Sequence, residues 1–202
     1  MKGYVLVNLR DMIEQLGEDK TKNILSNFSC PLNKDVDGFL KNKSIEFSKQ
    51  GIARTHLVLA SYKGSNVLVG YFTLATKTIA IYRTGLSKTL RKRITRFAQY
   101  DTKLKRYTLS APLIGQLSKN FLNGYDELIT GDELLKLACD KVKAIQGEIG
   151  GKVVYLECEE KPKLIDFYSE NGFVQFGKRK LDKDEKGLMH GEHLIQMLKY
   201  LK

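Results

Sequence analysis

Alternating and helix-like hydrophobic spacing divides this chain into a series of short strands and helices. The clearest pattern is a pair of apolar runs, residues 55–62 and 67–75, joined by a polar turn at residues 63–66. β-Branched and aromatic side chains fill both runs, and glycine and asparagine suit the turn, so we expect a β-hairpin whose second strand continues to Ile81. Further strands are expected over residues 4–8, 107–119, 152–158, 173–181 and 194–201.

Apolar residues spaced three and four apart predict the helices. They cover residues 9–28, with a break near Gly17, and residues 36–47, 87–100, 132–146 and 162–171. Thr130 and Glu133 have the spacing of a capping box at the start of the fourth helix, whereas Pro162 and Gly172 suit the first turn and the end of the last one. The alternation of strands and helices predicts a single α/β domain over residues 1–202, with one central sheet.

Composition is that of an ordinary globular protein, with 202 residues of which 42% are hydrophobic. The three cysteines, Cys30, Cys139 and Cys158, are far apart and form no C-x-x-C pair, so we expect free thiols, a cytoplasmic location and no zinc motif. His190 and His193 lack the spacing of a zinc-protease helix, so no metal is expected. The apolar N-terminal run is too short for a secretory signal, and no run approaches a membrane span, so we expect no membrane partner.

Positive charge is concentrated in one segment of the chain. The net charge is +11, and residues 86–106 carry eight Lys and Arg against one Asp, which gives 8 − 1 = +7. Such a concentration is either a solvated helix face or a surface that attracts polyanions. The cations expected to contact tRNA or another nucleic acid are Lys88, Arg91, Lys92, Arg93 and Arg96.

Two positions carry candidate chemistry. Tyr168 lies on the last predicted helix, four residues before Gly172; taken alone, it is a packed aromatic with its hydroxyl at the rim. The helix that starts at Gly131 presents unpaired N–H groups that can hold a phosphate, although Asp132 and Glu133 place negative charge there. If strands 107–119 and 152–158 are parallel, this helix start lies at their carboxyl ends, where open α/β sheets bind ligands.

The end of the chain resembles the GNAT N-acetyltransferase family. A strand, a loop and a short helix lead into F-Y-x-x-x-G-F, formed by Phe167, Tyr168, Gly172 and Phe173. Residues 70–74 are similar to a strand in the branch that includes toxins acetylating aminoacyl-tRNA, and the resemblance extends from Val36 to the end of the chain. It implies a GNAT-like mixed sheet of six to seven strands, splayed between strands 107–119 and 152–158.

The resemblance also assigns roles to individual residues. It places Leu117, Ser118 and Lys119 where main-chain groups pair with the pantetheine arm of acetyl-CoA. It places Thr130 and Gly131 where N–H groups hold the diphosphate, and it makes Tyr168 the general acid that protonates the departing CoA thiolate.

The diphosphate loop departs from the family pattern R/Q-x-x-G-x-G/A. With Gly131 in the last position, the earlier conserved positions of that pattern fall on Asp126 and Ile129. Lys161 also stands where the family often has asparagine before the tyrosine helix. These differences concern the geometry of the cofactor site. They do not remove the backbone N–H donors, because such donors need no particular side chain.

The function implied is transfer of an acetyl group from acetyl-CoA to a primary amine by direct attack, with an acceptor that could be free or RNA-linked, as in aminoacyl-tRNA. Candidate bases for the amine proton are Glu157, Glu159, His190 and His193, although each also fits a structural role. The alternative is a non-catalytic nucleic-acid-binding protein on a GNAT-like frame with a degenerate cofactor loop. Many relatives pair, so the resemblance leaves a homodimer open.

Overall fold

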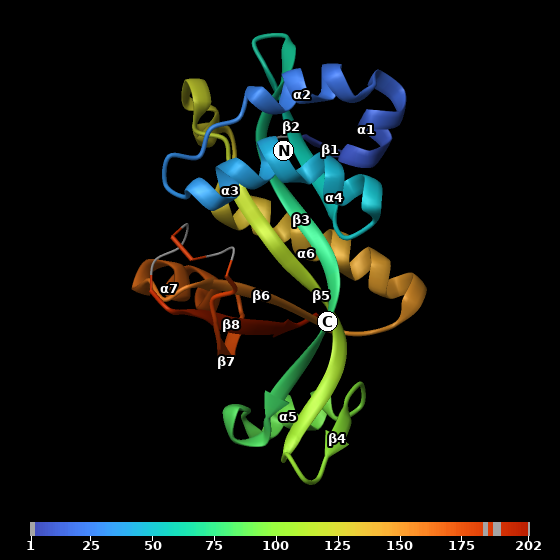
Figure 1. Cartoon of the computed structure of the whole chain (residues 1–202), viewed down its shortest axis with the longest axis vertical. Helices are drawn as coiled ribbons and strands as arrows, with labels where there is room; N and C mark the ends of the chain where they lie inside the picture. Colours follow the sequence, from blue (N-terminus) through green and yellow to red (C-terminus); the bar gives the residue numbers. More distant parts are fainter. Residues whose placement is uncertain (1–2, 184–185, 188–190, 202) are drawn as a thin grey trace. The chain divides into compact units, whose positions relative to one another are not determined.

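Eight strands form one mixed sheet in the computed structural model, which describes residues 3–183, 186–187 and 191–201 (Figure 1). The strands are β1 (Tyr4–Asn8), β2 (Arg54–Tyr62), β3 (Ser65–Tyr82), β4 (Gln99–Asp101), β5 (Arg106–Lys119), β6 (Val153–Glu159), β7 (Val174–Lys180) and β8 (His193–Tyr200). Their order is β1-β2-β3-β5-β6-β8-β7, and β4 pairs with β5. β5 and β6 are parallel, which confirms the mixed α/β fold expected from the sequence.

The helices begin and end largely where cap residues predict. They are α1 (Leu9–Leu16), α2 (Glu18–Ser26), α3 (Lys34–Gly38), the π-helical η1 (Phe39–Lys43), α4 (Ser44–Gln50), the 3-10 helix η2 (Arg83–Gly85), α5 (Lys88–Ile94), the 3-10 helix η3 (Leu122–Leu128), α6 (Gly131–Ile149) and α7 (Pro162–Glu170). Asn8 and Ser87 cap α1 and α5 by accepting a main-chain N–H. Among the helices of the described residues, none combines the length and hydropathy needed to cross a bilayer.

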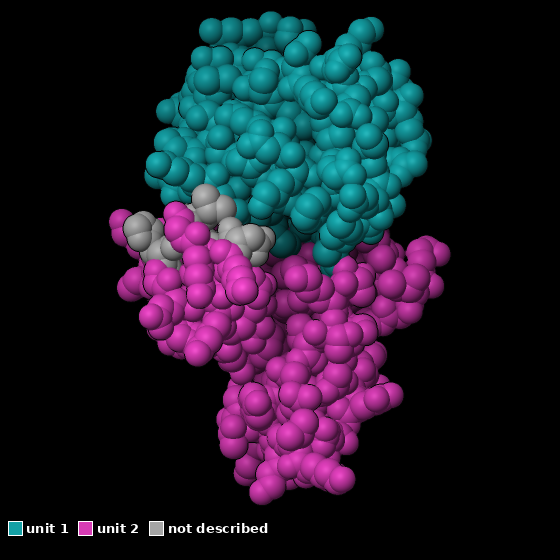
Figure 2. All heavy atoms as spheres, viewed as in Figure 1, with its two compact units in different colours: residues 1–75, 115–138 teal, residues 76–114, 139–202 magenta. Residues whose placement is uncertain are grey.

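The first of two compact units contains residues up to 75 together with 115–138 (Figure 2). Its core lies between α1–α4 and strands β2 and β3, and it includes Leu9, Leu25, Phe28, Leu40, Leu57 and Tyr71. The hydroxyl of Tyr71 donates to the carbonyl of Val36 at 2.6 Å, and its ring meets Phe28 edge-on at 5.2 Å. Because a buried hydroxyl needs a partner, this bond fixes the start of α3 against β3.

The second compact unit contains residues 76–114 and the chain from 139 onward. Its core joins α5, the end of β3 and the first half of β5 to strands β6, β7 and β8, through Ile81, Leu90, Ile94, Leu109, Tyr155, Phe176 and Leu198. Gly85 in η2 lies so close to β7 that a Cβ there would sit 2.9 Å from the Phe176 carbonyl oxygen. A single domain over residues 1–202 remains a prediction.

One predicted helix was wrong in extent. The helix expected over residues 87–100 ends at Ile94, and residues 99–101 form the short strand β4. The N–H of Phe97 closes a turn onto the Ile94 carbonyl, and the Asp101 carboxylate accepts from the amides of Lys103 and Leu104. A side chain that caps a turn in this way stabilises a β4–β5 hairpin in place of a longer helix.

Candidate functional site

Tyr168 is held by the packing of α7 and the residues that follow it. The helix begins at Pro162 and is closed by Gly172, whose φ of 80° lies in the left-handed region that favours glycine. The amide of Phe173 then donates to the Tyr168 carbonyl at 3.0 Å. Edge-on contacts with Phe167 at 5.0 Å and Phe173 at 5.9 Å hold the phenol ring in one orientation.

The phenol of Tyr168 is protonated at neutral pH. Burial, and secondarily the nearby Cys158, raise its pKa above the ordinary value. Burial and Glu159 likewise raise the pKa of Cys158 to about 11, and this cysteine is a buried free thiol. The pair therefore offers a proton donor in Tyr168 and no thiolate nucleophile in Cys158.

The ladder between β5 and β6 is short. It consists of the pairs Leu113–Tyr155 and Ile114–Leu156, whereas β5 continues to Lys119 and β6 to Glu159. The two strands are therefore parallel, which the sequence analysis left as a condition.

The end of β5 packs tightly against the neighbouring strand β3. A Cβ on Gly70 would lie 2.8 Å from the Ser118 carbonyl oxygen, and the amide of Asn120 donates to the Val69 carbonyl at 2.8 Å. Residues Leu117, Ser118 and Lys119, which were predicted to pair with pantetheine, form this segment. Glycine at position 70 therefore sets where the main chain of Ser118 lies.

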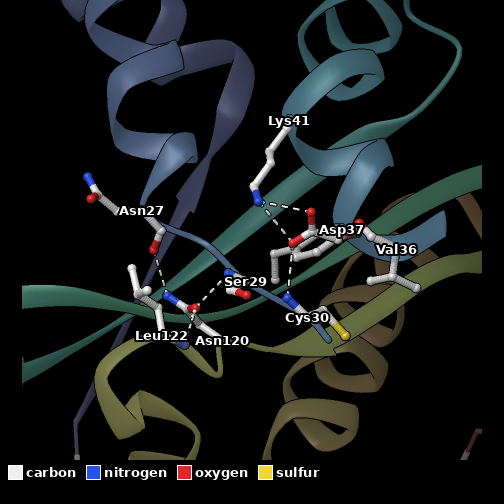
Figure 3. A network of polar contacts seen from close by, with 9 residues as sticks. Asn27, Ser29, Cys30, Val36, Asp37, Lys41, Asn120 and Leu122 are labelled. Carbon is white, nitrogen blue, oxygen red and sulfur yellow. Dashed lines mark hydrogen bonds and ion pairs between the residues drawn. The ribbon is translucent and has the colours of Figure 1, made fainter. Parts of the chain in front are cut away.

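Asn120 organises the chain just after β5, a role that no local sequence pattern indicates (Figure 3). Its side chain is fully buried and makes four hydrogen bonds. The amide group donates to the carbonyls of Asn27 and Leu68 at 2.8 Å each, and its oxygen accepts from the amides of Ser29 and Leu122. Asn120 thus ties two segments distant in sequence, residues 27–29 and Leu68, to the start of the predicted diphosphate loop.

The predicted diphosphate loop is a 3-10 segment held from several sides. Asn123 and Gly124 both have positive φ, which turns the chain within η3. Lys119 Nζ donates to the Asp126 carbonyl at 2.9 Å, and the Tyr4 hydroxyl donates to the Leu128 carbonyl at 3.1 Å. Burial and the neighbouring Glu133 raise the pKa of Tyr4 to about 12, so this hydroxyl remains a donor.

The start of α6 is a capping box, as predicted. Glu133 accepts from the amide and hydroxyl of Thr130 at 2.8 and 3.0 Å, and the Glu133 amide donates to the Thr130 hydroxyl at 3.1 Å. The amide of Gly131, at the first helical position, has no acceptor within the helix. Gly131 therefore suits a phosphate, whereas the Thr130 amide becomes available only if the Glu133 carboxylate moves away.

Two of the four candidate bases, Glu157 and Glu159, are engaged in other contacts. Glu157 accepts from Arg179 Nε at 2.6 Å and from Gln196 Nε2 at 2.8 Å, one on each carboxylate oxygen. Glu159 pairs with Lys161 at 2.8 Å. His193 begins β8, and His190 lies outside the described residues. Across the part of the chain that the structure describes, no group of three or more His, Cys, Asp or Glu side chains could hold a metal.

The predicted nucleic-acid-binding cations lie on α5 or just after it. Leu90 and Ile94 bury one side of this helix in the core of the second unit. The opposite side carries exposed Lys88, Lys92 and Arg93. The helix is therefore amphipathic, with a basic face toward solvent.

Comparison with known proteins establishes the fold. No protein-family model and no curated protein sequence matches the chain. Among solved structures, a tyrosine-to-phenylalanine mutant of KacT is 18% identical at a TM-score of 0.62, covering 96% of this chain and 94% of that one. AtaT complexed with acetyl-methionyl-tRNAfMet is 18% identical at 0.59, with the same coverages. AtaTR bound with AcCoA is 16% identical at 0.54, covering 95% of this chain and 91% of that one.

These structural similarities extend over nearly the full length of each chain, so the chains share one architecture. The strand order, the short parallel ladder of β5 and β6, and the glycine-closed helix α7 are its local features. The chain has the GNAT fold, in the form found in the KacT and AtaT toxins.

Proposed function

We propose that this chain is an acetyl-CoA-dependent N-acetyltransferase whose acceptor is a primary amine carried by RNA, as in aminoacyl-tRNA. The observation that carries the proposal is Tyr168, a protonated and oriented phenol on the short helix after β6 in a GNAT fold. Solved structures of the same fold contain acetyl-CoA in one case and acetyl-methionyl-tRNAfMet in another, which supports both the donor and the acceptor class.

Each proposed role follows from the chemistry of the residue. Acetyl-CoA supplies the acetyl group as a thioester. The main chain of residues 117–119 orients it, and an N–H from this strand polarises the thioester carbonyl. A neutral amine attacks that carbonyl, the carbon–sulfur bond breaks and a carbon–nitrogen bond forms. Tyr168 donates its proton to the departing sulfur, and the amine releases one proton.

The diphosphate is assigned to the start of α6. Gly131 offers an amide and close backbone approach, and the dipole of a 19-residue helix favours an anion there. The Glu133 carboxylate opposes that anion. This part of the site therefore fits acetyl-CoA best when the Glu133 side chain turns outward.

Binding of acetyl-CoA tests the catalytic proposal. Calorimetric titration should give saturable binding at micromolar concentration for the wild type and for Tyr168→Phe alike. Turnover on an amine should fall by about 10²–10⁴ in the variant, because only the proton donor is lost. Absence of binding would contradict the proposal and favour the non-catalytic alternative, while an unchanged rate would remove Tyr168 from the acid role.

The basic face of α5 supports an RNA-linked acceptor. Charges that contact phosphates release counterions, so binding weakens steeply with salt. Replacing Arg91, Lys92 and Arg93 together by Glu should lower activity on aminoacyl-tRNA far more than activity on a free amine. Equal losses on both acceptors would argue against recruitment through this helix.

A further inference from the structure

The second unit contains an open groove between α5 and the end of β8. It has a volume of about 490 Å³, within the range of about 300–1,000 Å³ typical of small-ligand sites. A second hollow of about 450 Å³ shares Thr89, Arg93 and Tyr200 with it, so we treat the two as one groove. Neither the catalytic tyrosine nor the predicted cofactor residues line it.

The groove combines an apolar floor with a basic rim. Leu90, Val174, Leu198 and Leu201 form the floor. Lys88, Lys92, Arg93, Arg96 and Lys199 form the rim, and no acidic side chain among the described residues lines either hollow. An anion is therefore favoured at the edge, and a flat apolar group is favoured inside.

Tyr200 adds an aromatic surface to this lining. The Arg93 guanidinium lies 5.3 Å from the ring centroid, and the partly exposed Phe97 ring is tilted against it at 6.4 Å. Aromatic rings and arginine planes together are the usual stacking partners of unpaired bases, with lysines tracking the phosphates.

The aromatic surface of the groove lies toward the other end of β6 from Tyr168, whereas another part of its lining is closer. Tyr200 pairs with Val153 at the start of β6, and Cys158, which acts electrostatically on Tyr168, lies five residues further along that strand, or about 17 Å. On the nearer side, Gly172 lines the groove, and Lys199 lies 5.6 Å from the Phe173 ring, which contacts Tyr168. A base stacked on Tyr200 therefore belongs to the carrier of the amine and not to the amine itself.

We propose that the groove binds an unpaired nucleotide of a single-stranded RNA segment, with the base against Tyr200 and the apolar floor and the phosphates on Lys88, Lys92 and Arg96. The inference rests on the proposed function only in taking RNA as the carrier. A second copy of the chain, docked by symmetry, would set one basic rim against another. An acidic peptide would satisfy the rim and leave the aromatic surface without a stacking partner.

The test uses fluorescence anisotropy on the full chain with a labelled single-stranded RNA decamer and the duplex of the same length. Thr89 is exposed on α5 and lines both hollows, so Thr89→Glu places a carboxylate in the groove without disturbing the core. Thr89→Gln is the neutral control of equal size. Tyr200→Ala removes the stacking surface, Tyr200→Phe keeps the ring, and Tyr82→Ala removes an exposed ring outside the groove.

We expect Thr89→Glu and Tyr200→Ala to weaken single-strand binding by about 5- to 100-fold, as for loss of one stacked base. Thr89→Gln, Tyr200→Phe and Tyr82→Ala should bind as the wild type does, and the duplex should bind more weakly than the single strand. Thermal unfolding of each variant checks that the fold is kept.

Three results of the binding assay would overturn the assignment, and a fourth comes from self-association. They are equal binding by Thr89→Glu and Thr89→Gln, a preference for duplex over single strand, and equally effective competition by polyglutamate of the same charge. Self-association of the wild type that Thr89→Glu abolishes would assign the groove to a second copy. Acetyl-CoA titration is run in parallel: RNA binding without acetyl-CoA binding rejects the proposed enzyme and leaves the groove assignment standing.

Discussion

Replacing Gly70 by Ala should move the strand assigned to pantetheine. The added Cβ would lie 2.8 Å from the Ser118 carbonyl oxygen and 3.4 Å from the Lys119 Cα. Ordinary contacts begin at 3.4 Å, so the two main chains must separate by 3.4 − 2.8 = 0.6 Å. Overpacking of this kind costs about 1–3 kcal/mol, which corresponds to about 2–12 °C in Tm for a chain of this size.

The shift at Ser118 should also weaken the binding of acetyl-CoA. Loss of one main-chain hydrogen bond, worth about 1 kcal/mol, corresponds to an affinity about fivefold lower. The matched control is Gly147→Ala, at an open position of α6 with nothing within 4 Å, which should gain up to about 1 kcal/mol. Thermal unfolding and calorimetry measure both quantities; equal stability and equal acetyl-CoA affinity in the two variants would refute the reasoning.

Three further predictions concern single side chains. Because the pKa of Tyr168 is raised, its proton is retained as pH increases, so kcat/KM should show no loss from its ionisation below about pH 10; a decline at pH 8–9 that Tyr168→Phe removes would contradict this. Glu133→Gln keeps a cap for Thr130 but removes the charge, so calorimetry should find acetyl-CoA bound about two- to fivefold more tightly, and weaker binding would count against the diphosphate assignment. Asn120→Ala should lower the free energy of unfolding by about 2–4 kcal/mol, because the buried Leu68 carbonyl loses its partner at about 1–3 kcal/mol and three part-buried main-chain groups lose theirs at a smaller cost; a loss below about 1 kcal/mol in denaturant titration would contradict it.

Local sequence signals predicted the elements that depend on local chemistry. The predicted turn at residues 63–66 joins β2 to β3, although only Lys63 and Gly64 form it and Ser65 already pairs with Tyr62. The capping box starts α6, and Pro162 with Gly172 bounds α7. In each case the residues that set the boundary lie within one turn of it. The same signals placed Tyr168 on its helix.

Features that depend on distant segments were missed. The hydrogen bonds of Asn120 join residues separated by 52 and 93 positions, and no local pattern encodes such pairs. The helix expected over residues 87–100 failed because Asp101 caps a turn that the apolar spacing does not register. The partners of Glu157, which make it a poor candidate base, likewise come from β7 and β8.

Acetyl transfer to aminoacyl-tRNA is the most direct test of the central claim. The purified chain is incubated with radiolabelled acetyl-CoA and a mixed aminoacyl-tRNA pool, and label on the α-amine is measured together with CoA release. The account predicts that label enters RNA in step with CoA release and that Tyr168→Phe lowers both by about 10²–10⁴. Release of CoA without labelled RNA, or no difference between wild type and variant, would contradict it.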